Sequence, residues 1–226
     1  FAAAGISAPS GHASLIDAVD TEQTFAAAAR LGIGIVIDPF VPSDRWQTAA
    51  DAARIAERVN ELQVQAATFG LRFGYHNHQW EFANHIAGES IFHAFVRDLE
   101  PEVVLEVDTY WSTVGGADTP TVLKSLGERV QLLHIKDGPV QGAIATSLPS
   151  SESALVVPKE LAQAFSDQLP AGQGDVDIPA ILAAAPHALR VVEFDGYAKD
   201  VFDGIAQSLA WLQANDPATG LRANYG

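Results

Sequence analysis

Two histidines in the segment FGYHNHQWEF, residues 73–82, have a spacing that could serve a chemical site. His76 and His78 are two positions apart and follow an apolar segment, LRFGY, that is typical of a strand. Alternate residues of an extended chain share one face, so both imidazoles are predicted to point into one space. Two imidazoles in one space could bind a metal ion or transfer a proton, or they could be two hydrogen-bonded core histidines.

Further ionisable residues stand at the carboxyl ends of other strand-like segments, and these residues are His12, Asp108, His134, Lys136, Asp137, Glu193 and Asp195. An apolar strand accepts a carboxylate only where something compensates its charge. A divalent cation bound by histidine and carboxylate ligands provides that compensation directly. His134 and Glu193 are the strongest individual candidates, because the strands around them are otherwise almost wholly apolar.

Several of these residues also have a plainer structural interpretation. His12 could be a turn residue, Asp108 could cap the segment TYWSTVGG, and Lys136 could form only a surface pair with Asp137. We expect Glu106 to face the helix layer, on the opposite side of its strand from Asp108. The remaining histidines lie in helix or loop contexts and are expected to be solvated: His85, His93 and His187.

The segment GQGD, residues 172–175, is a weak candidate for a phosphate-binding turn. It lacks the full GxGxxG pattern, and Asp175 and Asp177 would repel a phosphate. A turn that closes over a sugar is the better interpretation, because carboxylates and backbone amides form hydrogen bonds with hydroxyl groups.

Strands and helices are predicted to alternate along the chain. The predicted strands are 5–12, 33–40, 71–76, 102–108, 130–137 and 188–196, and the predicted helices are 21–32, 43–70, 88–99, 119–127, 158–168 and 200–214. Residues 170–185 are predicted to be a Gly-rich turn that enters another helix. We expect Ser43 to cap the long helix, Gly70 to end it, and residues 138–157 to form a loop.

This alternation predicts a parallel sheet covered by helices, in one domain that spans residues 1–226. An open doubly wound sheet and an eight-stranded barrel both place polar residues at the carboxyl ends of their strands. Six strand–helix units are two short of a barrel, and the chain begins at Phe1 and contains no Met. We therefore expect that one or two further units precede the first residue.

The amino-acid composition limits the kinds of molecule that the protein is expected to bind. The formal net charge is -15 and no run of basic residues occurs, which argues against nucleic acid. No apolar run approaches the roughly 20 residues that cross a bilayer, so we expect no membrane span. There is no Cys, hence no disulfide. The expected location is the cytoplasm, with export left open.

Five segments resemble one family when they are read together. GYHNHQWEF, DTYWSTVGGADTP, LLHIKDG, GQGDVDIPAIL and VVEFDG occur in this order, and the similarity extends over about residues 5–212. They resemble the xylose isomerase-like TIM-barrel superfamily, specifically its sugar phosphate isomerase/epimerase group. The resemblance implies an α/β fold, the TIM (β/α)8 barrel, in which this chain begins near the third strand.

The resemblance also implies a divalent metal ion, Mn²⁺, Mg²⁺ or Zn²⁺, held by Glu, Asp, His and Glu at four strand ends. Asp108, His134 and Glu193 match the last three ligands, and His76 stands where the first Glu would be. His76 is therefore the fourth expected metal ligand, within an HNH variant of the motif.

The implied reaction moves a proton on and off a carbon beside a carbonyl, through an enediolate. Glu193 would be the principal base, and His78 or Lys136 would assist proton transfer. The expected sugar or polyol substrate would contact His12, Trp111 and Glu81. We also expect that the protein could form a homo-oligomer.

Three alternatives remain beside a metal-dependent sugar isomerase or epimerase. A dehydratase acting on an inosose or keto sugar needs the same enolate and an acid for the leaving hydroxyl. A non-catalytic sugar-binding relative is conceivable because His76 departs from the motif. Repair of DNA, a further activity in the superfamily, conflicts with the acidic charge.

Overall fold

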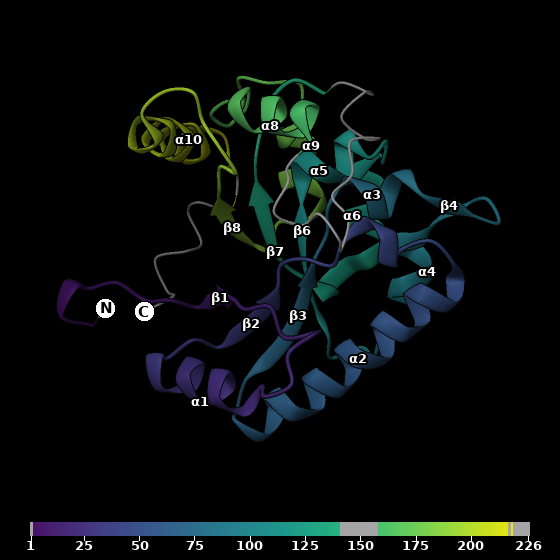
Figure 1. Ribbon diagram of the computed structural model, residues 1–226. Coiled ribbons are helices and arrows are strands. Elements are labelled where there is room, and N and C mark those ends of the chain that lie inside the picture. Colours follow the sequence, from purple (N-terminus) through teal and green to yellow (C-terminus); the bar gives the residue numbers. More distant parts are fainter. Residues whose placement is uncertain (1, 141–157, 217, 219–226) are drawn as a thin grey trace.

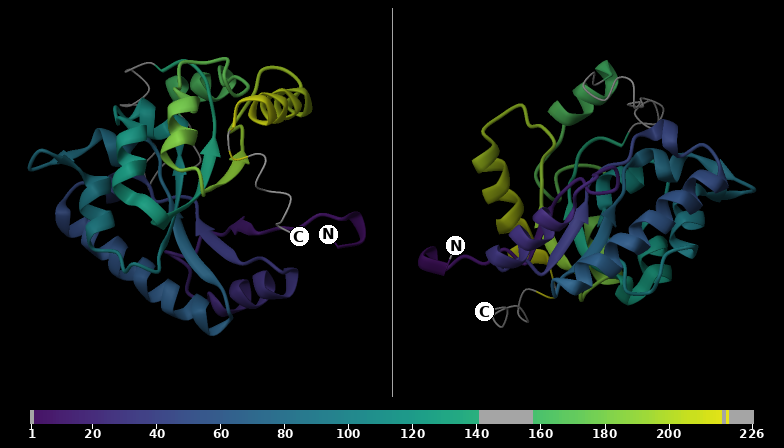
Figure 2. Two further views of the ribbon diagram at one scale, coloured as in Figure 1. Left: turned by 180° about the vertical axis from the view of Figure 1, so that it is seen from behind. Right: turned by 60° about the horizontal axis from the view of Figure 1, so that its bottom comes forward.

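A curled parallel sheet organises the computed structural model, which describes residues 2–140, 158–216 and 218 (Figure 1). Its six strands occur in the order β1-β2-β3-β6-β7-β8. Their bounds are β1 Ser10–His12, β2 Ile35–Asp38, β3 Arg72–His76, β6 Val104–Asp108, β7 Val130–Ile135 and β8 Leu189–Val192. Helices lie on the outside of the sheet in both views of Figure 2. The sheet is a half-barrel, so the predicted α/β fold of the TIM type is confirmed.

The helices connect successive strands on the outside of the sheet. They are α1 Glu22–Leu31, α2 Ala49–Thr68, α3 Gln79–Ala83, α4 Ile91–Arg97, α5 Thr109–Val114, α6 Thr119–Leu126, α8 Lys159–Ser166, α9 Ile178–Ala184 and α10 Val201–Asn215. Short 3-10 turns occur at Ala2–Ala4, Ser43–Arg45 and Gly127–Arg129, and β4 His85–Ile86 pairs with β5 Glu89–Ser90 as a small antiparallel hairpin. No helix within the described part of the chain is long and apolar enough to cross a membrane.

The long helix α2 begins five residues later than the sequence predicts. Thr48, and not Ser43, is its N-cap: the Thr48 hydroxyl accepts the Asp51 amide at 3.1 Å, and the Asp51 carboxylate accepts the Thr48 amide at 2.7 Å. This reciprocal pair satisfies two amides that the helix itself leaves free. Gly70 follows the helix with φ of 73°, as expected of a residue that ends it.

Two short helices were not predicted. Helix α3 begins two residues after β3, and α5 follows β6 directly, in the segment TYWSTVGG. Helices of five and six residues are too short to reveal a helical period. Most of the predicted loop 138–157 lies outside the described residues, so that prediction stays open, as does the single domain.

The inner face of the sheet carries small and apolar side chains below its carboxyl edge. Ile37, Val104 and Leu132 form a fully buried layer there. Gly74 belongs to the same layer, and any side chain at this position would collide with the carbonyl oxygen of Val104. The strands therefore approach closely, which brings the residues that follow on the inner face together.

The pairing register determines which polar residues meet. His76 of β3 is level with Glu106 of β6, and Asp108 of β6 is level with His134 of β7. An irregularity between Leu105 and Glu106 shifts the register of β6 against β7. Because all these strands are parallel, their carboxyl ends lie at one edge, where TIM-type folds build their sites.

Candidate active site

The structure brings the predicted strand-end residues together in two adjoining groups at the carboxyl edge of the sheet. We call His12, His76, Glu106 and His134 the histidine cluster, and Asp108, Lys136, Glu193 and Asp195 the lysine cluster. His134 joins the two, because its Nε2 lies 3.2 Å from Glu106 Oε2 and its Nδ1 lies 2.6 Å from Glu193 Oε2.

One carboxylate oxygen forms the centre of the histidine cluster. Glu106 Oε2 lies 2.6 Å from His12 Nε2, 3.2 Å from His134 Nε2 and 3.7 Å from His76 Nδ1. The ring centroids of His76 and His134 are 4.4 Å apart. Glu106, His76 and His134 are buried, and the side chain of His12 is 34% exposed. The cluster is thus open only on the β1 side.

The expectation that Glu106 faces the helix layer is wrong. Glu106 and Asp108 are two positions apart on β6, and residues at this spacing share a face of a strand. Glu106 is therefore a functional candidate that the sequence interpretation missed. The same spacing that singled out His76 and His78 was the signal that could have found it.

Burial and hydrogen bonding act in opposite directions on the ionisable groups of this cluster. Burial raises the pKa of Glu106, but the hydrogen bonds from His12 and His134 outweigh it and lower this pKa to about 2. Burial and the neighbouring cationic and imidazole groups lower the pKa of His76 well below its ordinary value. Burial also opposes the charged form of His134, yet the carboxylates of Asp108, Glu106 and Glu193 raise its pKa.

The lysine cluster contains an internal cation. Lys136 Nζ lies 2.9 Å from Asp108 Oδ2, 2.9 Å from Glu193 Oε2 and 2.9 Å from Asp195 Oδ2. Lys136 is buried, which lowers its pKa, but the charges of Asp108, Asp195 and Glu193 dominate and raise it. The ammonium group is therefore protonated at every physiological pH. It also lies 5.9 Å from the ring centre of Trp111, whose Nε1 donates to Asp195.

Asp137 does not pair with Lys136, contrary to one interpretation of the sequence. Its carboxylate accepts four backbone amides, from Gly138 at 2.8 Å, Gly172 and Gly174 at 2.9 Å each, and Val176 at 3.2 Å. Consecutive residues of an extended chain point to opposite sides, which separates Asp137 from Lys136. Asp137 thus anchors the GQGD turn to the end of β7.

His78 and Glu81 occupy the start of α3. The His78 ring stacks on Trp80 with centroids 4.5 Å apart, and it lies 5.1 Å from the ring of His76. Burial and the charge of Lys136 lower the pKa of His78 to about 3, so its imidazole is neutral.

Glu81 is not placed to contact a substrate as we expected. It is fully buried, and its two oxygens accept the Tyr75 hydroxyl at 2.6 Å and the His78 amide at 2.9 Å. Burial raises its pKa to about 8. This placement makes Glu81 a residue that positions the HNH segment.

The other histidines lie apart from both clusters. His85 is exposed, as expected. His93 and His187 are half-buried and not simply solvated: the His93 Nδ1 is 2.7 Å from the Ser90 hydroxyl, and the His187 Nε2 is 2.9 Å from the Val130 carbonyl.

The donor atoms of the two clusters fit a divalent cation. Two overlapping sets, His12–His76–Glu106–His134 and Asp108–His134–Glu193, each have their ligand atoms within 4.8 Å of one another. His76 Nδ1 is buried without a hydrogen-bond partner among the described residues. Its two nitrogens lie 3.7 Å from Glu106 and 3.7 Å from Asp108, too far for hydrogen bonds. Imidazole and carboxylate groups at such separations suit a bound ion between them.

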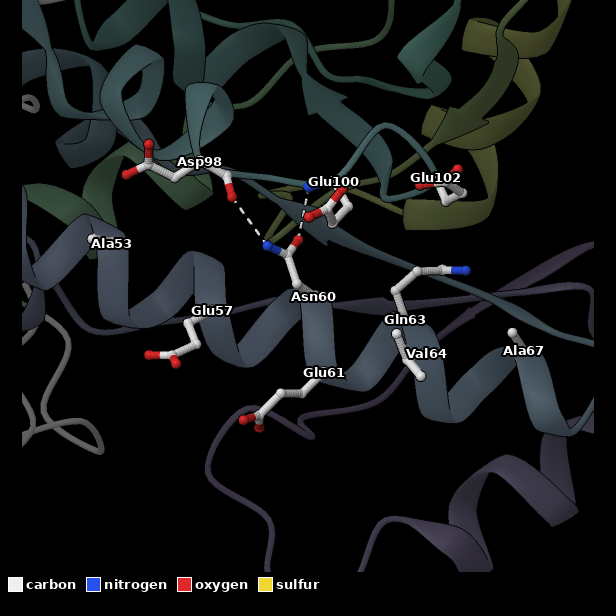
Figure 3. Close-up of a pocket in the computed structure, with 10 residues that line it drawn as sticks. All are labelled: Ala53, Glu57, Asn60, Glu61, Gln63, Val64, Ala67, Asp98, Glu100 and Glu102. Carbon is white, nitrogen blue, oxygen red and sulfur yellow. Dashed lines mark hydrogen bonds between the residues drawn. The ribbon is translucent and has the colours of Figure 1, made fainter.

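A groove of about 800 Å³ lies elsewhere, between α2 and the segment before β6 (Figure 3). Asn60 of α2 ties the two walls together, because its side chain donates to the Asp98 carbonyl at 3.0 Å and accepts the Glu100 amide at 2.8 Å. The carboxylates that line it, Glu57, Glu61, Asp98, Glu100 and Glu102, have no histidine among them. This groove therefore lacks the combination of imidazoles and carboxylates that the two clusters contain.

Comparisons with known proteins show the family of this chain and the proteins that share its fold. A family model described as xylose isomerase-like TIM barrel matches residues 17–214. The chain is similar to a sugar phosphate isomerase/epimerase from Parabacteroides distasonis, with 25% identity and a TM-score of 0.69 over 94% of this chain and 72% of that chain. It also resembles the probable 3-DHS dehydratase AsbF from Bacillus anthracis, with 12% identity and a TM-score of 0.65 over 92% of this chain and 76% of that chain.

A third similar structure is the IOLI protein with a bound zinc atom, with 13% identity and a TM-score of 0.59 over 85% of this chain and 66% of that chain. A search of curated proteins finds no significant match. The match to the family model covers most of the chain, including every strand-end residue described above except His12. The chain belongs to the xylose isomerase-like TIM barrel family, as its five motifs predicted.

Proposed function

We propose that this protein is a metal-dependent isomerase or epimerase that acts on a keto sugar or keto polyol through an enediolate. The observation that carries this proposal is the buried set of imidazoles and carboxylates at the carboxyl edge of the sheet, with Lys136 beside it. The similarity to a sugar phosphate isomerase/epimerase supports the same class of reaction.

The site residues have different roles in the proposed proton transfer. A bound divalent cation would polarise the substrate carbonyl and thereby acidify the neighbouring C–H bond. Glu193 is the base: its side chain is 36% exposed, the most accessible carboxylate in contact with Lys136, and hydrogen bonds from His134 and the charge of Lys136 keep it ionised despite partial burial. The positive charge of Lys136 would stabilise the oxygen on which negative charge develops.

His78 completes this arrangement. Its neutral imidazole can accept a hydrogen bond from a substrate hydroxyl. Epimerisation returns the proton to the opposite face of the same carbon, whereas isomerisation returns it to the neighbouring carbon. His12 is partly exposed beside the clusters and would contact the sugar ring. Trp111 is 1% exposed, and its Nε1 donates to Asp195, so it would position that carboxylate and not contact the sugar as we expected.

An uncharged substrate fits the charges of the site best. Lys136 is shared among three carboxylates, so its charge is already balanced. No lysine or arginine occurs in residues 141–157. The site residues therefore offer no surplus cation for a phosphate group.

Exchange of substrate hydrogen with solvent tests the proposal. The protein, loaded with Mn²⁺, Zn²⁺ or Mg²⁺, is incubated in D₂O with a panel of keto sugars and keto polyols. We expect deuterium at the carbon beside the carbonyl, detected by NMR, and loss of this exchange in Glu193→Gln. Absence of exchange with every metal and substrate would contradict the proposal.

Dehydration is the second candidate, because an acid and a base lie side by side. Glu193 and Lys136 are 2.9 Å apart, so one can remove the proton while the other protonates the leaving hydroxyl. The similarity to a probable dehydratase supports only the fold for this reaction. A new ultraviolet-absorbing conjugated carbonyl in the same incubations would identify elimination in place of isomerisation.

A further inference from the structure

We propose that Asp195 and Gln168 are positioning residues, which together hold the ammonium group of Lys136 in place. Glu193 is then free to act as the base. This inference rests on the proposed function, because it assigns roles to two further residues of the same site. Asp195 lies just beyond the end of β8, and Gln168 follows α8.

Three side chains among the described residues donate hydrogen bonds to the Asp195 carboxylate. Lys136 Nζ donates to both of its oxygens, at 3.0 and 2.9 Å. Its Oδ2 also accepts the Trp111 indole nitrogen at 3.1 Å and the Gln168 side-chain amide at 2.7 Å. The indole and the amide carry no charge, so they fix the carboxylate without replacing Lys136 as its cation. Asp195 is therefore a well-held counter-ion for this lysine.

Gln168 fixes both the side chain and the backbone of Asp195. The Gln168 Nε2 donates to Asp195 Oδ2 at 2.7 Å, and the Gln168 Oε1 accepts the Asp195 backbone amide at 2.8 Å. Gln168 is 1% exposed, so water does not compete for these two hydrogen bonds. A residue that is held at its main chain and at its carboxylate has little freedom to rotate away from Lys136.

The backbone beside Gln168 is joined to the strand that carries Lys136. The Leu169 amide donates to the Asp137 carbonyl at 2.8 Å, and these two residues directly follow Gln168 and Lys136 along the chain. The backbones of Gln168 and Lys136 are therefore held at a fixed separation. The end of β8 is attached to this pair through Asp195.

A glycine permits the close approach between the chain that follows β8 and the end of α8. A side chain at Gly196 would place its Cβ 3.1 Å from the Phe165 Cβ and 3.3 Å from the Phe165 carbonyl oxygen. Carbon atoms in ordinary packing lie about 3.5–4.0 Å apart. The lack of a side chain at Gly196 therefore lets Asp195 come within hydrogen-bonding distance of Gln168.

Glu193 is held less firmly than Asp195. Its contacts with Lys136, at 2.9 Å, and with His134, at 2.6 Å, both involve Oε2. Within the described ranges of the chain, its Oε1 takes part in no hydrogen bond or ion pair. The Glu193 side chain is 36% exposed, against 21% for Asp195. A base has to reach the substrate hydrogen and a counter-ion has to stay in place, so Glu193 suits the first role and Asp195 the second.

The position of Lys136 matters because a charge stabilises a developing oxyanion best when it is fixed before the reaction. Without Asp195, the ammonium group would be left with Asp108 and Glu193. A closer pair with Glu193 would then draw the base away from the substrate. Loss of either positioning residue should therefore slow the chemical step more than it weakens substrate binding.

The kinetics of deuterium exchange from D₂O test this assignment, with the metal and substrate on which the wild type is active. Gln168→Met keeps the length of the side chain and removes both hydrogen bonds, whereas Asp195→Asn keeps the shape and removes the charge. We expect each to lower kcat by about 10-fold or more and to change KM by less than about threefold, because a displacement of ~1 Å can cost about 100-fold in rate. Asp195→Glu restores a carboxylate and should recover part of the rate.

Gln163→Met is the matched control for Gln168→Met. Gln163 is exposed on α8 and also donates to an aspartate, Asp167, at 2.9 Å, but this pair lies on the protein surface. The control substitution should leave both kcat and KM unchanged.

The indole N–H signal of Trp111 gives a second readout, which uses the metal-free protein without substrate. Its NMR resonance depends on the hydrogen bond to Asp195, and Trp111→Phe identifies it among the four tryptophans. We expect this resonance to shift in Gln168→Met and in Asp195→Asn, and to stay unchanged in Gln163→Met.

The outcomes separate this inference from the proposed function. Wild-type kcat or an unshifted indole resonance in Gln168→Met would overturn the inference and leave the proposed function intact. Equal losses in Asp195→Asn and Asp195→Glu would give Asp195 a purely structural role and overturn it as well. Absence of exchange by the wild type would overturn the proposed function and, with it, this inference. Circular dichroism confirms folding, and the partly exposed Asp195 keeps the test valid if Gln168→Met does not fold.

Discussion

The histidine cluster and the lysine cluster lie side by side at one edge of the sheet, yet they stabilise buried carboxylates in different ways. Glu106 is surrounded by imidazoles, which can be neutral, charged or bound to a metal ion. Asp108, Glu193 and Asp195 share a lysine that is always charged. The imidazoles around Glu106 can change their protonation state, whereas Lys136 stays protonated at every physiological pH. Carboxylates at neighbouring strand ends are thus stabilised in two ways, by imidazoles around Glu106 and by the ammonium group of Lys136 beside Asp108, Glu193 and Asp195.

Removal of the fixed cation should have the largest effect on stability. Lys136→Met removes the cation that three carboxylates share, and breaking a buried ion pair in this way costs about 3–5 kcal/mol. Urea unfolding of metal-free protein at pH 7 measures the loss. The exposed Lys124→Met is the control and should change the free energy of unfolding by less than about 0.5 kcal/mol. If Lys136→Met and Lys124→Met changed the free energy of unfolding equally, Lys136 would not stabilise the buried carboxylates as we infer.

The stability that Glu106 contributes should depend on pH in a defined window. Its pKa falls from an ordinary value of 4.5 to about 2 on folding, so this stability is fully present above pH 4.5 and disappears as the pH falls toward 2. Glu106→Gln should therefore lower the free energy of unfolding by about 2–3 kcal/mol at pH 6 and by much less near pH 2.

The control for this second prediction comes from the groove beside α2. Glu57 is an exposed carboxylate there, and Glu57→Gln should show no comparable change between pH 6 and pH 2. A pH-independent loss in Glu106→Gln would mean that Glu106 contributes by packing and not by its charge.

Substitution of His12 is expected to have the smallest effect on the free energy of unfolding of the metal-free protein. The hydrogen bond of His12 to the buried Glu106 is partly exposed on the histidine side, so His12→Ala should cost about 1–2 kcal/mol, less than either substitution above. The same substitution should abolish most of the rise in melting temperature that Zn²⁺ produces, because binding to the native state is what stabilises it. Differential scanning fluorimetry compares it with His85→Ala, an exposed histidine outside the clusters. An undiminished Zn²⁺ response in His12→Ala would show that His12 does not help to hold the ion.

The sequence could place the site because parallel strands align their carboxyl ends. His76, Asp108, His134 and Glu193 each follow an apolar run, and this regularity alone brings them to one edge. The orientation of Glu106 could also have been predicted, because Glu106 and Asp108 are two positions apart and therefore share one face of β6. We assigned Glu106 to the opposite face.

Other features depend on contacts that the sequence does not display. The partners of Lys136 come from β6 and from the end of β8, so only the strand order reveals them. The four amides that Asp137 accepts lie up to 39 residues away along the chain. Both Ser43 and Thr48 could cap α2 according to residue type. The helix begins after Thr48 because the Asp51 carboxylate accepts the Thr48 amide and completes the reciprocal cap.

The anchoring of the GQGD turn by Asp137 has an entropic consequence for ligand binding. Gly172 has a φ of 78°, and a side chain at Gly174 would collide with the Asp137 carboxylate, so the glycines permit this close approach. Four amide hydrogen bonds to one carboxylate hold the turn in a single conformation while the site is still empty of substrate. A sugar that contacts this turn would therefore bind to a surface that is already ordered. Binding would not be weakened by the entropy cost of ordering a mobile loop.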